Sequence, residues 1–383
     1  MSVTAPKGFR AAGVAAGIKD GGSLDLAVVV NDGPADVAAG VFTSNRVCAA
    51  PVIWSREAVA DGALRAVVLN SGGANACTGE EGMADTATTA DRLADLLGVA
   101  CHDVAVCSTG LIGERLPMEP LLAGVDSAVA GLSAHGDADA ARAIMTTDTR
   151  PKTAVFNGGG WSIGAMAKGA GMLAPALATM LVVVTTDAVI TPEQADTALR
   201  AATEVSLNRL DSDGCQSTND TVLLLSSGAS GVELDTRTFA AALTTVCLDL
   251  GSQLLGDAEG SSHDIAILVR GAASEADALE VGRAIARSNL FKCAIFGNDP
   301  NWGRVLSTVG TTSAVFDPDE LDVSFNGVMV CRGGAIGEDR SLVDLHPREV
   351  SVVVDLHAGG EQATIWTNDL TYDYVKENAE YSS

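Results

Sequence analysis

The chain has 383 residues, with 24 lysines and arginines against 49 aspartates and glutamates, so its formal net charge is −25. Binding to nucleic acid or to an anionic membrane through charge needs a basic surface, so neither is an expected partner. With 47% apolar and 19% charged residues, the chain is too apolar to be disordered and long enough to fill more than one hydrophobic core.

Short β-branched runs alternate with alanine-rich amphipathic stretches, which predicts a mixed α/β fold. In chain order we expect a strand at 26–31, a strand at 66–70, a helix at 83–97, a strand at 104–107, a strand at 181–186, a helix at 195–207, a strand at 221–226, a helix at 238–255, a strand at 265–270, a helix at 274–287 and a strand at 350–356. The best helix start is Thr191-Pro192-Glu193-Gln194, a capping residue followed by proline in the first turn.

Domain boundaries are weakly marked. A boundary near 271–275, between a strand and a helix, would set off a smaller unit over about 272–356. The tail at 368–383 is polar, which is typical of a frayed end. The cluster at 211–220 and the stretch at 298–304 are interpreted as rigid turns, since the acidic spacing of the first fits no calcium loop.

The sequence predicts a cytoplasmic protein without metal or cofactor. No apolar run approaches the roughly 20 residues of a membrane-spanning helix, and the glycine-broken run after Lys7 and Arg10 is a poor signal peptide. The eight cysteines form no Cys-x-x-Cys pair and the five histidines no paired ligand spacing. This pattern is typical of reduced thiols in a reducing compartment.

The most unusual segment is 168–181 (KGAGMLAPALATML). Its Gly169-x-Gly171-x-x-Ala174 pattern fits a dinucleotide-binding fingerprint, with Asp187 downstream. However, a phosphate-binding loop must open a crossover helix, and too few residues stand before the strand at 181–186. A nicotinamide-dependent dehydrogenase therefore stays only as a remote alternative.

The same segment contains a candidate nucleophile, Thr179, directly before a buried strand. A threonine made amino-terminal by cleavage of the preceding peptide bond has its own α-amine as general base, with a pKa of about 7.7 to 8.0. No histidine is then required. From residue type alone, Thr179 would more often simply begin a strand.

The segment resembles the cleavage site of the ornithine acetyltransferases, also called ArgJ-type glutamate N-acetyltransferases, which cut themselves between Ala and Thr. Further blocks follow in that family's order and span the chain: 42–45 (FTSN), 70–79 (NSGGANACTG), 108–113 (STGLIG), 145–149 (MTTDT), 257–260 (DAEG), 298–304 (NDPNWGR) and 378–383 (NAEYSS).

The resemblance implies a layered α/β sandwich of N-terminal-nucleophile type, made of two interlocked chains after cleavage at Ala178-Thr179. The α chain would be 1–178 and the β chain 179–383, assembled as a heterotetramer of two α and two β chains. Thr179 would take the acetyl group of N-acetylornithine and pass it to glutamate in a ping-pong reaction of arginine biosynthesis or related secondary metabolism. Whether acetyl-CoA is a second donor stays open.

The resemblance also assigns residues to the site. Thr109 and Gly110 would form the oxyanion hole, Lys168 would meet a substrate carboxylate, and Glu259 would suit the ammonium end of ornithine. Further substrate contacts are implied for Thr146, Thr179, Asn378 and Ser383. If so, the polar tail is ordered and returns to the site.

Two other classes of protein stay open. One is a self-processing amidase or aminopeptidase with the same nucleophile, in which water replaces glutamate as the acceptor. The other is an uncleaved binding or scaffold protein that keeps the fold without the chemistry.

Overall fold

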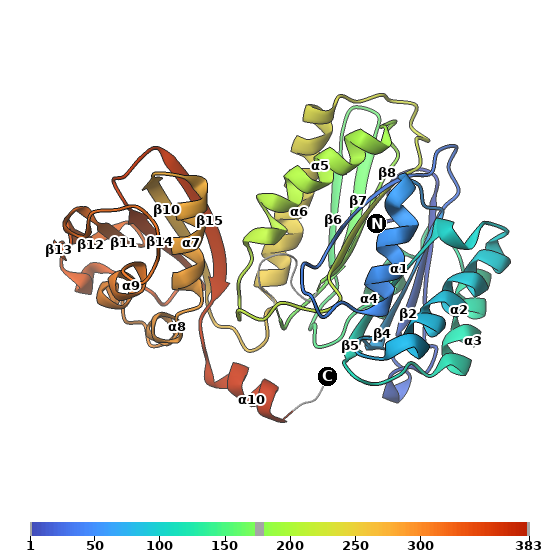
Figure 1. Ribbon diagram of the computed structural model, residues 1–383, viewed down its shortest axis with the longest axis horizontal. Helices are drawn as coiled ribbons and strands as arrows, with labels where there is room; N and C mark the ends of the chain where they lie inside the picture. The colour runs from blue at the N-terminus through green and yellow to red at the C-terminus, as the bar shows by residue number, and fades with distance from the viewer. Residues whose placement is uncertain (1, 173–179, 381–383) are drawn as a thin grey trace.

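The computed structural model describes residues 2–172 and 180–380 of the chain. Two facing sheets carry helices on their outer sides, and a third unit with its own sheet follows toward the C-terminus (Figure 1). This architecture confirms the predicted α/β class. The predicted division between residues 178 and 179 lies outside the described residues.

The first sheet has the strand order β1-β2-β4-β5. Its strands are β1 (Phe9–Val14), β2 (Leu26–Asn31), β4 (Ala66–Gly73) and β5 (Val104–Leu111). β4 and β5 run parallel because α2 (Gly79–Leu97) carries the chain back between them. Alternate side chains such as Val28 and Val30 face α2 and α3 (Met118–Ala130), while Ala27 and Val29 face the second sheet.

The second sheet has the order β3-β9-β8-β7-β6. Its strands are β3 (Val37–Phe42), β9 (Thr221–Ser226), β8 (Leu181–Thr186), β7 (Ser162–Lys168) and β6 (Lys152–Asn157). The helices α5 (Pro192–Glu204) and α6 (Thr236–Leu255) cover its outer face. β8 and β9 are buried on both faces, as strands covered on both sides must be.

Helix α6 is long and apolar enough, by composition, to cross a bilayer. Half of that stretch is buried inside the protein, and Phe239, Leu243 and Val246 belong to the core between α6 and the second sheet. Its sequence therefore fits a core helix.

A core between the two sheets joins them. Leu69 and Cys107 of the first sheet share it with Val183 and Leu223 of the second. The helices α1 (Ala50–Ala58) and α4 (Asp137–Ala143) also lie between the sheets, and β5 contacts β8 directly (Figure 1). The ends of β5 and β8 are thereby held close together, which positions the site described below.

The third unit is a six-stranded sheet in the order β13-β12-β11-β14-β10-β15, with three helices packed on it. Its elements are β10 (Asp264–Ala272), α7 (Glu275–Ala286), α8 (Asn289–Phe296), α9 (Trp302–Val309), β11 (Asp322–Phe325), β12 (Val328–Arg332), β13 (Ala335–Ile336), β14 (Glu349–Asp355) and β15 (Glu361–Asn368). Since β10 and β15 pair with each other, the sheet extends beyond the expected 272–356 at both ends.

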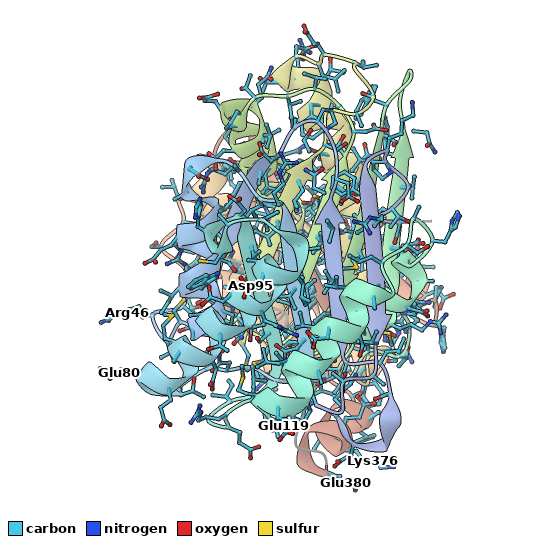
Figure 2. All side chains as sticks on the ribbon, turned by 90° about the vertical axis from the view of Figure 1, so that its right-hand side faces the viewer. Arg46, Glu80, Asp95, Glu119, Lys376 and Glu380 are labelled. Atoms are coloured by element: carbon cyan, nitrogen blue, oxygen red, sulfur yellow. The ribbon has the colours of Figure 1, made fainter. Side chains whose placement is uncertain are left out.

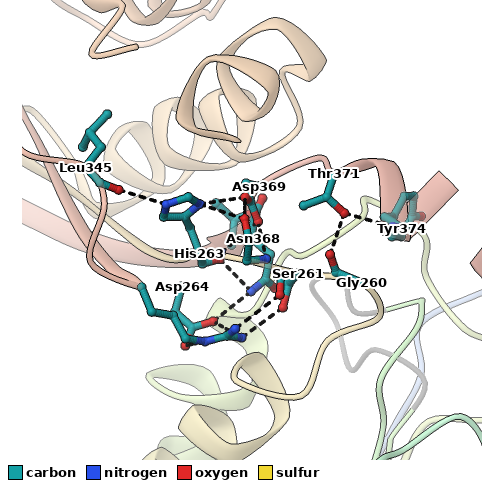
Figure 3. A network of polar contacts seen from close by, with 12 residues as sticks. Gly260, Ser261, His263, Asp264, Leu345, Asn368, Asp369, Thr371 and Tyr374 are labelled. Carbon is teal, nitrogen blue, oxygen red and sulfur yellow. Dashed lines mark hydrogen bonds and ion pairs between the residues drawn. The ribbon is translucent and has the colours of Figure 1, made fainter. Parts of the chain in front are cut away.

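A polar network fixes the chain where it enters and leaves this unit (Figure 3). His263, before β10, contacts the Asp369 carboxylate through Nδ1 at 2.7 Å and the Leu345 carbonyl through Nε2 at 2.9 Å. Thr371 then donates to the Gly260 carbonyl at 2.5 Å. The final helix, α10 (Tyr372–Glu380), is thereby held against the loop at 259–261.

The expected strands and helices are all present, with shifted ends in several cases. The strand expected at 104–107 continues to Leu111, and the helix expected at 83–97 begins at Gly79. Thr191 forms the expected helix cap, with a complete capping box to Gln194. Short 3-10 turns complete the chain at Asp20–Gly22, Val59–Asp61, Cys101–Asp103, Leu207–Arg209, Pro318–Glu320 and Arg340–Leu342.

The surface carries the negative charge. Figure 2 labels Glu80 and Asp95 on α2 and Glu119 on α3, the helices that cover the first sheet. All three side chains are exposed, so water solvates their charges.

Candidate active site

The end of β5 carries the expected oxyanion residues. The expected strand ended at residue 107, before Thr109 and Gly110, but the structure places both residues within β5, opposite Ser71 and Gly72 of β4. The strand register shifts there, at Gly72 and Gly73. Gly110 has φ +132°, and a Cβ on it would lie 2.6 Å from the Gly72 carbonyl carbon, so only glycine fits this position.

Lys168 is the last residue of β7 and is almost fully buried, with 1% of its surface exposed. Its Nζ donates a hydrogen bond to Thr109 Oγ1 at 3.3 Å. Burial lowers the pKa of Lys168, while the nearby carboxylates of Asp148 and Glu259 oppose that shift. The amino group of Lys168 thus lies beside Thr109, and the nearby carboxylates favour its charged form.

Asp148 organises the turn before β6. One of its oxygens accepts from the Gly169 amide at 2.7 Å and from Lys152 Nζ, and the other accepts from the Thr146 amide at 3.0 Å. Burial would raise the pKa of Asp148, but the charges of Lys168 and Lys152 outweigh it and hold the pKa below its ordinary value. This carboxylate therefore stays ionised and fixes both Thr146 and the chain after Lys168.

Lys152 extends the same network. It is fully buried and also contacts the Asp257 carboxylate, which accepts from the Thr149 amide at 3.0 Å. A buried lysine between two carboxylates is electrically compensated and hydrogen-bonded, so it is stable in the low-dielectric interior. The network ties the 145–149 turn to the loop that carries Glu259.

Glu259 accepts two side-chain hydrogen bonds. Thr147 Oγ1 donates to one carboxyl oxygen at 2.7 Å, and Asn378 Nδ2 of α10 donates to the other at 3.0 Å. A Cβ on Gly171 would lie 2.6 Å from the Glu259 carboxylate, so a glycine is needed where the chain passes this side chain. The tail thus brings Asn378 against Glu259, and its part in a substrate site stays a prediction.

Two cavities meet at Thr146. One, of about 710 Å³, is lined by acidic groups that include Glu259 and Glu377, together with Asn378. The other, of about 870 Å³, is lined by Gly110, Lys19 and Arg142. The cavity at Gly110 therefore carries basic and acidic groups together, since Asp20 and Glu114 line it as well, whereas the cavity at Glu259 is mainly acidic.

The structure brings together most of the residues that were predicted for the site. Thr109, Gly110 and Lys168 form one group, Glu259 and Asn378 a second, and Thr146 lies between them. Thr179, Ala178 and Ser383 lie outside the described residues.

Several site residues were not predicted. The buried network consists of Asp148, Lys152 and Asp257. A turn formed by Asn219 and Asp220 packs against β5, where Asn219 donates to the Ser108 carbonyl. Asp148 and Asp257 fall within sequence blocks that were noted for other residues. Lys152 had no sequence signal, and it is the first residue of β6, a strand that the sequence did not predict. Asn219 and Asp220 were assigned only to a rigid turn, although they directly precede a buried strand.

Two expectations for motifs have clear outcomes. β7 and β8 are antiparallel neighbours, with Lys168 opposite Leu181, whereas a dinucleotide fingerprint joins two parallel strands, so the dinucleotide alternative is wrong. The 298–304 stretch lies in the third unit, where Asn301 caps α9. Among the described residues no cluster of His, Cys, Asp or Glu is arranged to hold a metal ion.

A buried cation beside a strand-end threonine is suited to an enzyme that stabilises negative charge developing on a carbonyl oxygen. The fold and the site together define the class of the protein as an α/β acyltransferase. A family model described as the ArgJ family matches residues 10–383, and the chain belongs to the ArgJ family.

The sequence similarity to curated relatives extends over the whole chain. The arginine biosynthesis bifunctional protein ArgJ of Thermobifida fusca is 66% identical over 383 residues, and that of Streptomyces coelicolor is 64% identical; both alignments cover all of each chain. The solved ornithine acetyltransferase of Mycobacterium tuberculosis, complexed with ornithine, is 55% identical; the match covers 47% of this chain and 96% of that chain, with a TM-score of 0.45. The predicted acyltransferase class and the place in arginine biosynthesis are confirmed by the family and its full-length relatives.

Proposed function

We propose that the protein transfers the acetyl group of N-acetylornithine to glutamate, through an acetyl ester on Thr179, in the cytoplasm. Cleavage between Ala178 and Thr179 comes first and frees the α-amine of Thr179 as the general base. We further propose that two α chains (1–178) and two β chains (179–383) assemble as a heterotetramer. No cofactor takes part, and acetyl-CoA is a second candidate donor.

The observation that carries this proposal is the hydrogen bond of Lys168 to Thr109. It places a buried cation at the end of β7, next to the two residues proposed to stabilise a developing oxyanion. Fixed donors and charges of this kind act strongly in a water-poor site, because they need no reorganisation during the reaction.

Cleavage would begin with attack of the Thr179 hydroxyl on the Ala178 carbonyl carbon. The peptide C–N bond then breaks, the new ester is hydrolysed by water, and Thr179 keeps a free α-amine. The second sheet supports such a cut because its strands come from both sides of it. β3, β6 and β7 precede the cut, β8 and β9 follow it, and the pairs β7-β8 and β3-β9 would hold the two chains together.

In the transfer reaction, Thr179 Oγ would attack the acetyl carbon of N-acetylornithine while the α-amine takes the hydroxyl proton. Collapse of the tetrahedral intermediate gives that proton to the departing ornithine nitrogen. The amine of glutamate then attacks the acetyl ester, and N-acetylglutamate leaves. Two half-reactions through one covalent intermediate give ping-pong kinetics.

The charges of the site support both substrates. N-acetylornithine carries a carboxylate and a distant ammonium, and glutamate carries two carboxylates and the amine that attacks. Lys168 can compensate a carboxylate, and Glu259, with Asn378 beside it, can accept an ammonium. Thr146 and Ser383 are proposed to complete the substrate contacts.

The first experiment is the intact mass of the denatured protein, wild type against Thr179→Ala. Cleavage of the 38.9 kDa chain at Ala178-Thr179 gives pieces of about 18 and about 21 kDa in proportion to length, whereas the variant stays whole. Next, N-acetylornithine is supplied with and without glutamate. Ornithine release that depends on glutamate supports a transferase, and release of acetate without glutamate would instead support a hydrolase.

A further inference from the structure

Lys19 lies next to the proposed oxyanion residues, and the proposed mechanism does not use it. Its side chain passes over β4, because a Cβ on Gly72 would lie 2.8 Å from Lys19 Cγ. Gly72 is in turn the residue of β4 that packs against Gly110. Lys19 also lines the cavity of about 870 Å³ that Gly110 and Thr146 line. A half-buried lysine therefore borders the cavity beside the end of β5.

A buried carboxylate holds the loop that carries Lys19. Asp25 has none of its surface exposed, and its side chain accepts hydrogen bonds from the four successive amides of residues 16–19, at 2.6 to 3.1 Å. The Asp25 carbonyl accepts from the amide of Ser71, the residue paired with Thr109. Hydrogen bonds to an ionised acceptor are strong, so this loop is firmly fixed to β4. The main chain thus sets the position of Lys19.

The amino group of Lys19 has one described hydrogen bond. Nζ donates to the Met145 carbonyl at 3.0 Å, and an ammonium carries two further N–H donors. The Met145 carbonyl shares a peptide unit with the Thr146 amide, which donates to Asp148 at 3.0 Å. This peptide is therefore held from both sides, and Lys19 keeps donors for a ligand in the cavity.

The surroundings of Lys19 favour its charged form. Burial lowers the pKa of Lys19, and the charges of Asp25 and Asp148 oppose that shift. Both carboxylates already accept hydrogen bonds from backbone amides, Asp25 from residues 16–19 and Asp148 from Gly169. The two carboxylates therefore support the ammonium of Lys19 while they are engaged elsewhere.

The other charged groups of this cavity are exposed. Asp20 and Glu114 are in contact with water, which screens their charges. Arg142 is exposed as well, and it pairs with Asp139 at 3.5 Å. Lys19 is thus the charged residue of this cavity wall that is partly shielded from water and best able to bind an anion.

The two substrates of the proposed reaction end in opposite charges. The side chain of ornithine ends in an ammonium and that of glutamate in a carboxylate, yet a ping-pong reaction brings both to one centre. The cavity at Glu259 suits the ammonium. It repels a carboxylate, since burial raises the pKa of Glu377 and the charges of Glu259 and Asp373 add to that rise. The carboxylate of the glutamate side chain therefore needs a cation in another part of the site.

We propose that Lys19 is a specificity-determining residue, whose ammonium binds the side-chain carboxylate of glutamate in the cavity lined by Gly110 and Thr146. The inference rests on the proposed function. It divides the site at Thr146, which lines both cavities: the ammonium of ornithine goes to Glu259, and the second carboxylate of glutamate goes to Lys19. Lys168 stays available for the α-carboxylate of either substrate.

The test is the choice between glutamate and glutamine as acceptors, which have nearly the same shape and differ in the charge at the side-chain end. We expect the wild type to prefer glutamate in kcat/KM by about 10- to 100-fold, the size of one charge-assisted hydrogen bond. In Lys19→Met this ratio falls to about one, because the KM for glutamate rises while glutamine is used as before. Lys19→Arg keeps the charge and should keep the preference.

The first half-reaction distinguishes this role from a general one. Ornithine released from N-acetylornithine without an acceptor measures formation of the acetyl-enzyme, and its rate should be equal in Lys19→Met and the wild type. Lys7→Met is the matched control. It removes the same charge at an exposed lysine just before β1, whereas Lys19 follows the other end of that strand. Its preference for glutamate should be that of the wild type.

Loss of the preference in Lys19→Met, with the preference kept in Lys19→Arg and Lys7→Met, supports the inference. A wild type that uses glutamate and glutamine equally overturns it without any variant. An equal loss of both acceptors in Lys19→Met, or a slower release of ornithine, also overturns it. Because both acceptors are compared in one preparation, a smaller folded fraction cancels from the ratio. A wild type that releases no ornithine from N-acetylornithine contradicts the proposed function instead.

Discussion

Lys168 Nζ and Thr109 Oγ1, 3.3 Å apart, join the ends of two strands from different sheets. Both residues are almost fully buried. The core between the sheets fixes the distance between β5 and the second sheet, and the hydrogen bond fixes the rotamers of both side chains. The sandwich therefore determines the geometry of the proposed oxyanion site.

Thr109→Val should be almost inactive. Valine keeps the shape but removes the hydroxyl, so the oxyanion loses a donor and Lys168 loses its described hydrogen-bond acceptor. We expect kcat to fall about 10²- to 10³-fold. Steady-state kinetics on protein of verified cleavage state measure this. Thr88→Val, at an exposed hydroxyl of α2 that bonds only within its own helix, is the control. Wild-type turnover in Thr109→Val would exclude the hydroxyl from the reaction.

Glu259→Gln should weaken the use of N-acetylornithine. The carboxylate accepts from Thr147 and Asn378, and the amide has a single acceptor oxygen and no charge for an ammonium. We expect kcat/KM for N-acetylornithine to fall about 10- to 100-fold. The measurement is the first half-reaction, followed by ornithine release. Glu361→Gln, at an exposed position of β15, should leave it unchanged. An equal loss in both variants would mean a general effect of charge.

Thr371→Val should weaken the docking of α10 against the loop at 259–261. Its hydroxyl donates to the Gly260 carbonyl and accepts from the Tyr374 amide at the start of α10. Loss of such a cap costs about 1 kcal/mol, which corresponds to about a fivefold rise in KM when the helix must be docked for binding. Hydrogen exchange over 372–380 and substrate KM should rise together.

Thr191→Val, the cap of α5 far along the chain from the tail, is the matched control for that substitution. Its stability should fall by a similar amount with no change in KM. If both caps alter KM equally, the tail has no special part in substrate binding.

Because of Lys292, the free energy of unfolding should change with pH in the alkaline range. Burial lowers the pKa of this α8 lysine to about 8, from 10.5 in the unfolded chain. Between these values the unfolded state binds more protons than the folded state, so the free energy of unfolding rises with pH. The rise is at most about 3 kcal/mol. Denaturant unfolding from pH 7 to 10.5 measures it as the difference between wild type and Lys292→Met.

Lys376→Met is the control for that series, since it makes the same substitution at an exposed position of α10. The slope of stability against pH should be lost in Lys292→Met and kept in Lys376→Met. Parallel curves for wild type and Lys292→Met would contradict the assignment.

The sequence located the fully buried strands without error. β8 and β9 coincide with the expected 181–186 and 221–226, because continuous apolar runs bounded by polar residues have clear ends. β7 was missed, since SIGAMAK contains small residues with little strand preference, and it forms only by pairing between β6 and β8. Likewise, Thr109 and Gly110 belong to β5 only because β4 continues beside them.

By itself, the sequence determined the α/β class, the principal elements and, through motifs that are local in the chain, the family; it also predicts the site residues Thr109, Gly110, Lys168 and Glu259. The tertiary structure decided which of these meet. It paired Lys168 with Thr109, brought Asn378 back to Glu259 and placed Asp220 against the Met180 amide. Periodicity records which face of an element is buried, whereas strand order and register depend on packing between segments far apart in the chain.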